Sequence, residues 1–281
     1  MSKLDLLAIG PHPDDVELGC GGTLALAARQ GRRVGILPLT RGESGTRGTA
    51  ALRQAEAERA AAALGAAELA FLDCGDGALR NGRPEEDALI DVLRAWRPEL
   101  VLSPAPRDRH PDHGRGHELA AAAAYYSGLA ARGGRGSAPH RPAAVFSYMQ
   151  HNSFEPSFVV DVTAVWDVKM QALAAYPSQI YQTGLAGRAG QPDQSGQPGQ
   201  PDQPGQPGQP HRPAQPGPPG QPAAPNAEPV TKVSSRQFRL AVEGRARHFG
   251  QLIGAELGEP FWSPLQLAVA DLFALQPGGV R

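Results

Sequence analysis

Short apolar segments alternate with helical segments through the first half of the chain, and this alternation restricts the fold more than any other feature. Strands that alternate with helices at such spacings predict an α/β fold with a mainly parallel sheet. Ligands in such folds bind at the carboxyl ends of the strands. The predicted strands are 4–9, 34–39, 69–72 and 100–103, and the predicted helices are 17–30 (or 22–30), 50–64, 85–96 and 116–126.

The second half of the chain adds further elements. Residues 145–149 and 158–162 are predicted strands, and antiparallel pairing stays open for both. Residues 165–176 and 235–257 have helical patterns. Together with the first half, they predict a doubly wound, Rossmann-like sheet flanked by helices. We expect a single domain formed by residues 1–183 and 230–281.

One segment departs from this pattern. Thirteen of the 28 prolines and nine glutamines lie between positions 190 and 229, where Gln recurs at every third position over a long stretch. A collagen triple helix requires Gly at every third position, and Asp193, Asp202 and His211 occupy such positions. We therefore predict that residues 184–229 form a disordered, low-complexity insertion with partial polyproline character.

Charge and cysteine content exclude several classes of protein. The formal net charge of −1 argues against non-specific binding to nucleic acid or to an anionic membrane. No apolar stretch approaches the ~20 residues of a membrane span. The apolar run in residues 1–9 is short for a signal peptide and contains Asp5. Cys20 and Cys74 cannot form a disulfide framework, so we predict a cytoplasmic protein.

Two clusters of chemically active side chains follow predicted strands. His12-Pro13-Asp14-Asp15 comes after the first strand. Its histidine and the carboxylate three residues on can bind one metal ion, while the neighbouring carboxylate can face a metal-bound water. Arg109-His110-Pro111-Asp112-His113 follows the fourth strand and offers two imidazoles and another carboxylate.

These residue types predict a metal centre. Two His and one Asp with an open position form a catalytic zinc set, and the same set is the facial triad of non-haem iron. Bound zinc would lower the pKa of a coordinated water to about 7 and polarise a carbonyl. A free carboxylate can then accept the proton of the water, and a nearby cation or imidazolium can stabilise an oxyanion.

The clusters also have purely structural interpretations. Asp14 or Asp15 could cap the following helix. Two His-Pro-Asp clusters, each after a strand, favour the metal site over that alternative. His117 lies four residues after His113 and could be a third imidazole ligand, although we favour a helix residue packed beside the site.

Two further features are open from the residues alone. Arg53 and Glu56 have the i,i+3 spacing of a solvated ion pair on a helix. Residues 41–48 form a Gly-rich polar loop. This loop either binds substrate or only connects two elements.

At these motifs the sequence resembles the LmbE-like (PIG-L) zinc N-deacetylases. The stretch Pro-His-Pro-Asp-Asp-Val-Glu-Leu-Gly at 11–19 resembles the signature of that superfamily, and His-Pro-Asp-His at 110–113 looks like its second motif. The similarity covers nearly the whole chain outside 184–229. Further stretches look most like the bacillithiol biosynthesis branch, namely 40–43, 53–65, 107–113, 157–161, 176–179, 245–247 and 258–261.

The resemblance implies a role for each motif residue. The implied ligands of one Zn²⁺, or of another divalent metal such as Fe²⁺, are His12, Asp15 and His113. Asp14 would be the general base. His110, held by Asp112, would stabilise the oxyanion or donate a proton to the leaving amine.

The resemblance also implies the substrate and the residues around it. Arg53 matches an arginine that reaches into the site, which favours a catalytic role over the surface ion pair. Arg109 matches an arginine that meets carboxylates, which suit its forked guanidinium, and Glu43 and Ser44 would meet sugar hydroxyls. In the bacillithiol branch the substrate is the N-acetylglucosamine glycoside of malate. The expected reaction is hydrolysis of its acetamide to the free amine and acetate.

Two departures from the family pattern leave alternatives open. Pro11 stands where a small residue is expected, and the 184–229 insertion follows Gln179 and Tyr181, near the place where relatives complete the substrate pocket. Rival functions are a deacetylase for another amino sugar or a detoxification conjugate, an iron-dependent oxygenase, and a non-enzymatic metal- or sugar-binding module. The resemblance is also consistent with a homo-oligomer.

Overall fold

The computed structural model describes residues 3–132, 138–182 and 228–268. By internal contacts the chain forms two units, Met1–Tyr181 with Val230–Arg281, and Gln182–Pro229. Nearly all of the predicted 184–229 insertion lies outside the described residues, so its disorder stays a prediction. In the part of the chain that is described, no helix is long and apolar enough to cross a membrane.

A seven-stranded sheet with the order β3-β2-β1-β4-β5-β7-β6 forms the centre of the described fold. Five strands run parallel, and β7 pairs antiparallel with both β5 and β6. The predicted α/β fold with a mainly parallel, helix-flanked sheet is therefore confirmed. The strands are β1 (Leu6–Gly10), β2 (Val34–Pro38), β3 (Glu68–Leu69), β4 (Leu100–Pro104), β5 (Ala144–Tyr148), β6 (Phe158–Asp161) and β7 (Gly258–Trp262).

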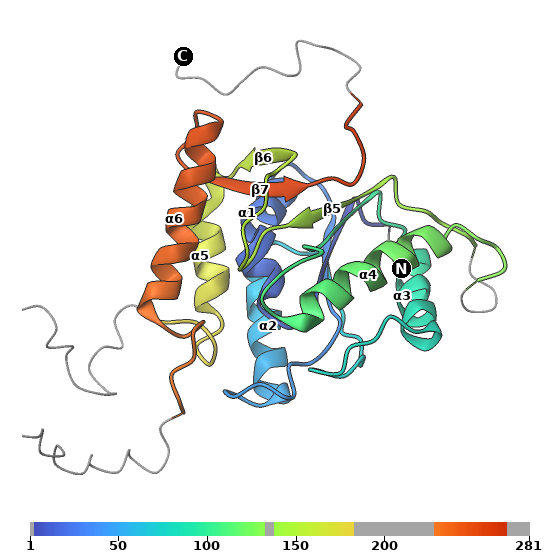
Figure 1. Ribbon diagram of the computed structural model, residues 1–281, viewed down its shortest axis with the longest axis horizontal. Helices are drawn as coiled ribbons and strands as arrows, with labels where there is room; N and C mark the ends of the chain where they lie inside the picture. The colour runs from blue at the N-terminus through green and yellow to red at the C-terminus, as the bar shows by residue number, and fades with distance from the viewer. Residues whose placement is uncertain (1–2, 133–137, 183–227, 269–281) are drawn as a thin grey trace, which may run out of the picture. The chain divides into compact units, whose positions relative to one another are not determined.

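Helices cover both faces of this sheet (Figure 1). Successive residues of β1 point to opposite faces, so Leu6 and Ala8 join one apolar core while Leu7 and Ile9 join the other. Helices α1, α2, α5 and α6 contribute to the first core, and α3 and α4 contribute to the second. The helices are α1 (Asp15–Arg29), α2 (Ala50–Leu64), α3 (Arg83–Trp96), α4 (Pro111–Tyr126), α5 (Trp166–Ala174) and α6 (Arg236–Leu252), with a short 3-10 turn at Thr163–Val165.

Helix α2 follows its predicted end signals. The Thr49 side chain accepts a hydrogen bond from the backbone N–H of Leu52, as expected of an N-cap. The helix ends at Gly65, whose φ of 74° is a left-handed conformation that glycine adopts without steric penalty.

Helix α4 begins earlier than predicted. The sequence predicts a loop through His113 and a helix from about Gly116, whereas the helix starts at Pro111. Proline suits the first helical position because its missing N–H has no partner there. His110 is the N-cap residue, and its side chain accepts from the Asp112 backbone N–H. The second cluster therefore lies on the first turn of a rigid helix.

The edges of the sheet differ most from expectation. Strand β3 has only two residues instead of the predicted four. Strand β5 pairs parallel with β4 and antiparallel with β7, and β6 pairs antiparallel with β7, so the antiparallel pairing left open for residues 145–149 and 158–162 occurs in both strands. Strand β7 was not among the predicted strands, and it contains Pro260. Proline is tolerated at positions where a strand needs no N–H donor.

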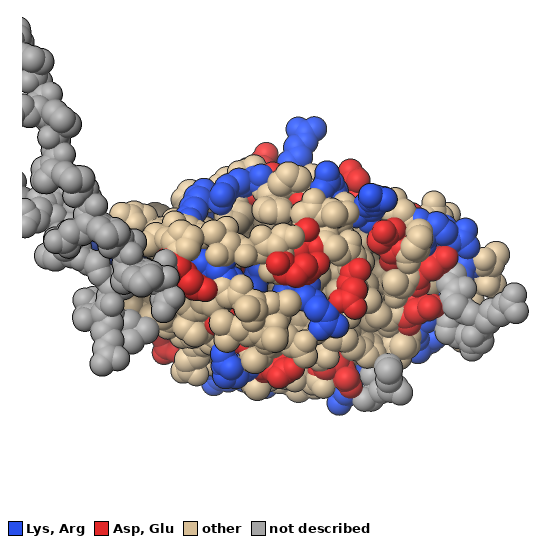
Figure 2. Space-filling model, turned by 90° about the horizontal axis from the view of Figure 1, so that it is seen from below, with Lys and Arg blue, Asp and Glu red and all other residues tan. Residues whose placement is uncertain are grey.

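Charged side chains of both signs are interspersed on the face shown in Figure 2. This mixture agrees with the near-neutral net charge of the sequence.

Candidate metal centre and active site

The polar clusters meet at the carboxyl-end edge of the parallel strands. His12 to Asp15 follow β1, and Asp108 to His113 follow β4. Gln150 and His151 follow β5, and Asp76 lies in the loop between β3 and α3. A doubly wound sheet is expected to bind its ligand at this edge.

Asp14 has an unusual backbone and an unusual carboxyl group. Its φ of 99° is left-handed, a conformation that costs about 1–3 kcal/mol for a residue other than glycine. Its side chain makes no capping hydrogen bond to α1, which excludes the simple cap interpretation. Burial raises the pKa of Asp14 to about 7, although the Arg53 guanidinium, 3.6 Å away, opposes that shift. Strain and burial together make Asp14 a candidate functional residue.

The Asp15 carboxylate lies at the centre of the cluster. Its Oδ2 accepts from the His12 backbone N–H at 2.8 Å and lies 3.1 Å from His12 Nδ1. Its Oδ1 lies 3.3 Å from His113 Nε2 and accepts from Gln150 Nε2 at 2.5 Å. Asp15 is 3% exposed, so both imidazoles face a carboxylate that is shielded from water.

The outer nitrogens of both imidazoles face other carboxylates. His113 Nδ1 lies 2.7 Å from Asp108 Oδ2. His12 Nε2 lies 3.1 Å from Asp76 Oδ1 and 3.5 Å from Asp112 Oδ2. Neither contact of His12 Nε2 has hydrogen-bond geometry within the described residues. Burial disfavours the charged imidazolium of His113, but Asp15 and Asp108 outweigh it and raise the pKa of His113 to about 9.

A divalent metal ion fits this donor set. Two buried imidazoles and a buried carboxylate are the ligand types that zinc and iron use in catalytic sites. In the metal-free protein, negative charge around the two imidazoles raises both of their pKa values, despite burial. A cation bound between the imidazoles and Asp15 would replace those protons, which is the usual coupling of metal binding to proton release.

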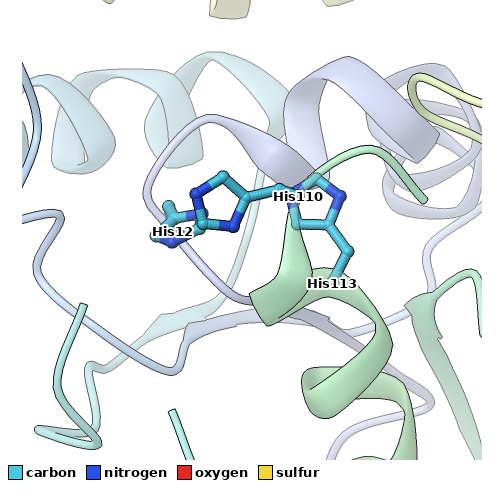
Figure 3. Close-up of side chains that lie close together, drawn as sticks. All are labelled: His12, His110 and His113. Carbon is cyan, nitrogen blue, oxygen red and sulfur yellow. The ribbon is translucent and has the colours of Figure 1, made fainter. Parts of the chain in front are cut away.

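His110 lies beside the two buried imidazoles but is more exposed (Figure 3). Its ring centre is 4.7 Å from that of His12 and 5.6 Å from that of His113. One ligand atom from each of His12, His110 and His113 lies within 4.8 Å of the other two. His110 Nδ1 already accepts the Asp112 N–H at 3.2 Å, so its proton is on Nε2.

The expected support of His110 by the Asp112 carboxylate differs in the structure. The backbone amide of Asp112 contacts the His110 ring. The fully buried carboxylate instead accepts from Gly77 N at 2.8 Å and from Arg115 at 3.0 Å, and it faces His12. The Asp112 carboxylate therefore binds the loop at Gly77 and its own helix at Arg115, and it lies 3.5 Å from His12.

Arg53 is a buried site residue and not half of a surface ion pair. It donates to the carbonyl oxygens of Pro13 at 2.7 Å and Gly42 at 3.1 Å, and its Nε has no hydrogen-bond partner within the described residues. Glu56, its proposed surface partner, is fully buried and accepts from the backbone and hydroxyl of Ser178.

The predicted substrate-binding residues have different positions. A cavity of about 310 Å³ covers the cluster, and Ser44 and Arg109 are part of its lining. Glu43 is absent from that lining, and its carboxylate accepts from the backbone amides of Arg41 and Asp76. Glu43 therefore holds the 41–48 loop in place. The lining also includes Gly45, Thr46, Arg47, Arg53, Gln150, His151, Gln179, Thr231 and Val233.

His117 lies beside the site, as favoured from the sequence. Its Nδ1 is 3.1 Å from both Pro104 O and Ser147 Oγ, and it is absent from the cavity lining.

Sequence reasoning missed four residues that contact the cluster: Asp76, Asp108, Gln150 and His151. Each lies in a loop that follows a strand, where the carboxyl-end rule expects the site, but that rule does not select these residues from their loop neighbours. His151 stacks on His113 with 5.7 Å between ring centres, and its buried Nδ1 has no partner within the described residues. Burial lowers the pKa of His151 to about 4, so its ring is neutral near pH 7.

Comparisons with known proteins agree with this geometry. Residues 7–124 match the family model described as PIG-L: GlcNAc-PI de-N-acetylase. The diacetylchitobiose deacetylase of Thermococcus kodakarensis is 35% identical over 188 residues, which cover 62% of this chain and 69% of that protein. The 1D-myo-inositol 2-acetamido-2-deoxy-alpha-D-glucopyranoside deacetylase of Kineococcus radiotolerans is 31% identical over 186 residues, about half of each chain.

One solved structure is similar to this chain over nearly the full length of both proteins. The crystal structure of a conserved protein from Thermus thermophilus matches with a TM-score of 0.73 and 33% identity, over 95% of this chain and 98% of that one. The two named relatives are deacetylases of diacetylchitobiose and of an inositol glycoside, and they give no support to the predicted bacillithiol branch. The chain belongs to the PIG-L family of metal-dependent deacetylases, which act on N-acetylglucosamine-containing substrates.

Proposed function

We propose that this protein is a zinc-dependent hydrolase that removes the acetyl group from a small N-acetylglucosamine conjugate. The observation that carries the proposal is the position of Asp14. Its strained, buried carboxyl group adjoins a cluster of two imidazoles and a carboxylate beneath a cavity. That juxtaposition matches a base beside a metal site.

His12, Asp15 and His113 would hold the metal through His12 Nδ1, an Asp15 oxygen and His113 Nε2. These are the atoms that already converge on the Asp15 carboxylate. When bound, the metal would polarise the acetamide carbonyl and lower the pKa of water.

Asp14 is the proposed general base. A pKa of about 7 lets it accept a proton from the attacking water near neutral pH and return that proton in a later step. The Arg53 guanidinium, 3.6 Å from Asp14 Oδ1, holds the carboxylate and favours its charged form. The Asp14 side chain makes no capping hydrogen bond to α1, so the helix N-terminus does not occupy the carboxylate.

His110 is the proposed oxyanion donor. Because Nδ1 accepts the Asp112 N–H, the Nε2–H is free to donate to a developing oxyanion. Burial, followed by the positive charges of His12 and His113, lowers the pKa of His110 and favours this neutral form. Water adds to the acetamide carbon, the C–N bond then breaks, and the amine nitrogen takes the proton from Asp14. The products are acetate and the free amine.

The finer proposal is that the conjugate has an anionic group, as in the malate glycoside. Three arginines line the cavity, Arg47, Arg53 and Arg109. Arg47 Nε donates to Ser178 O at 2.6 Å and Arg53 donates to two backbone carbonyls, so the proposal uses Arg109. Arginine suits carboxylates because its guanidinium can donate two parallel hydrogen bonds. The substrates named for the two relatives are neutral, so charge distinguishes the proposals.

Acetate release tests both levels of this proposal. The zinc-loaded full chain is incubated with N-acetylglucosaminyl malate, N,N′-diacetylchitobiose and the N-acetylglucosaminyl inositol, with and without a chelator. We expect release that the chelator abolishes and added zinc restores, and the highest kcat/KM on the malate glycoside. Release from none of the three compounds would refute the deacetylase proposal, and a preference for the neutral ones would refute only the anionic substrate.

Arg109→Gln gives a matched test of the charge argument. We expect it to lower kcat/KM about tenfold or more for the malate glycoside, the loss of one charged hydrogen bond, and to spare diacetylchitobiose. Arg107→Gln is the control, because Arg107 is exposed and absent from the cavity lining. The iron-dependent oxygenase alternative predicts bound iron and oxygen-dependent turnover, which metal analysis and an anaerobic assay would detect.

A further inference from the structure

The two buried imidazoles of the cluster have the same arrangement of partners. Each directs one ring nitrogen at Asp15 and the other at a carboxylate on a different loop. His12 uses Nδ1 toward Asp15, at 3.1 Å, whereas His113 uses Nε2, at 3.3 Å. The two rings therefore approach Asp15 with opposite nitrogens.

Asp108 is the outer partner of His113 and is itself held firmly. Its Oδ2 lies 2.7 Å from His113 Nδ1 and accepts from the His151 backbone N–H at 3.3 Å. Its Oδ1 accepts from the backbone N–H groups of Arg109 at 2.7 Å and Asn152 at 2.8 Å. These three backbone donors fix the carboxylate, which leaves its Oδ2 directed at the His113 ring.

Asp76 is the outer partner of His12. Its Oδ2 accepts from the Ser44 backbone N–H at 2.9 Å, and its Oδ1 faces His12 Nε2 at 3.1 Å. Asp112 Oδ2 lies 3.5 Å from the same His12 Nε2, but it already accepts a hydrogen bond from the Gly77 backbone N–H at 2.8 Å. The buried Nε2 makes no hydrogen bond of good geometry within the described residues, and of these two carboxylates Asp76 lies nearer to it.

A neutral imidazole carries its proton on one nitrogen and can bind a metal only through the other. A carboxylate beside one nitrogen keeps the proton there, because it can only accept. In metal sites such partners fix the tautomer and orientation of the ligating ring.

We infer that Asp76 and Asp108 are positioning residues that hold His12 as the Nε2–H tautomer and His113 as the Nδ1–H tautomer, so that His12 Nδ1 and His113 Nε2 face one metal ion bound with Asp15. This inference rests on the proposed metal-dependent function. The same geometry has a rival interpretation, because His12, Asp76 and Asp112 could themselves bind a second cation.

Two variants test the inference through metal affinity. Asp76→Asn and Asp108→Asn each keep the shape of the side chain but lose the charge that favours the ring proton. Losing such a partner typically weakens metal binding about 10–100-fold. We expect a loss of this size in each variant, measured by zinc competition with a chromophoric chelator. Asp73→Asn is the control, because Asp73 lies three residues from Asp76, has a 72% exposed side chain and pairs only with Arg41 in the described structure.

Imidazole ¹⁵N spectra of the zinc-loaded wild-type chain provide a readout that needs no variant. We expect a protonated Nε2 for His12 and a protonated Nδ1 for His113. The opposite assignment for either ring, or zinc affinity in both variants within twofold of the wild type, would overturn the inference. A stoichiometry of two zinc ions per chain would also overturn it, in favour of the second cation site.

These outcomes are separable from failure of the proposed function. A wild-type chain that binds no zinc refutes the metal-dependent function itself. A wild-type chain that binds zinc and releases acetate, with unaffected Asp76→Asn and Asp108→Asn variants, refutes only the positioning role. Melting temperatures in chelator check that each variant folds like the metal-free wild type.

Discussion

Replacing Lys169 with methionine should destabilise the protein strongly, because Lys169 forms a buried ion pair beneath the site. Its Nζ lies 2.5 Å from Glu259 Oε1 and donates to the Leu18 carbonyl at 3.0 Å, and both charged side chains are 3% exposed. Glu259 also accepts from the backbone amides of Gly22 at 2.9 Å and Thr23 at 2.7 Å. The pair therefore joins β7 and α5 to the middle of α1.

This contact lies where α1 departs from helical geometry. Cys20 has φ −143° and ψ 19°, so the helix is kinked there. The kink leaves the Leu18 carbonyl and the Gly22 and Thr23 amides to find partners outside the helix, and Lys169 and Glu259 supply them. The first turn of the same helix begins at Asp15, so the pair also supports the site.

The expected magnitude follows from burial. Removing one partner of a buried ion pair typically costs about 3–5 kcal/mol, because the remaining charge loses its counter-ion. In a domain of this size 1 kcal/mol changes the melting temperature by about 2–4 °C. Lys169→Met should therefore lower the melting temperature by about 6–20 °C in differential scanning calorimetry. Lys232→Met is the control, since Lys232 is exposed. A Lys169→Met protein that melts within 2 °C of the wild type would refute this reasoning.

Two further predictions concern the site. Metal-free His113 has a pKa raised to about 9, so it carries a proton at neutral pH that zinc must displace. Apparent zinc affinity should therefore rise about tenfold per pH unit for each displaced proton between pH 6 and 8, and titration calorimetry in buffers of different ionisation enthalpy should detect the released proton. A zinc affinity that does not change with pH would contradict the assignment of His113 as a ligand. Arg53→Met removes the positive charge beside Asp14 and two buried hydrogen bonds to the carbonyls of Pro13 and Gly42. We expect kcat to fall about 10–100-fold and the apparent pKa of the acidic limb of the pH–rate profile to rise, because the charge that favours ionised Asp14 is lost. An unshifted pH–rate profile would contradict the role of Asp14 as the base that Arg53 supports.

The sheet and the two His-Pro-Asp clusters were predictable from the sequence because both depend on local patterns. Buried strands are short apolar segments, and the His-Pro-Asp clusters are contiguous. Thr49 and Gly65 gave equally local signals for the ends of α2. The start of α4 was missed because residues 107–113 were assigned to a loop, whereas Pro111 is the first helical residue.

The partners of the two imidazoles could not be identified in the same way. Asp76 and Gln150 contact residues that are far away in the sequence, and no motif marks them. An isolated Asp or Gln in a loop has many structural uses, and only the folded arrangement selects one of them. Glu43 illustrates the converse, because its carboxylate binds backbone amides and not the cavity.

Substrate specificity is the property that is hardest to predict from local sequence patterns. Arg47, Arg109, Gln179 and Thr231 come from four separate parts of the chain and line one cavity. Motifs identify the reaction because the reacting groups lie close together in the sequence. Relatives of 31–35% identity have differently named substrates, so membership of the family does not by itself determine the conjugated group.

The central claim is that Asp14 acts as the base beside a metal held by its neighbours, and the Asp14→Asn variant tests it most directly. Zinc content and acetate release are measured on the same purified sample with N-acetylglucosaminyl malate and diacetylchitobiose. We predict about one zinc per chain, as in the wild type, and a loss of kcat of about 10²–10⁴-fold, the usual contribution of a general base. A variant that keeps its zinc and retains near-full turnover would contradict the account.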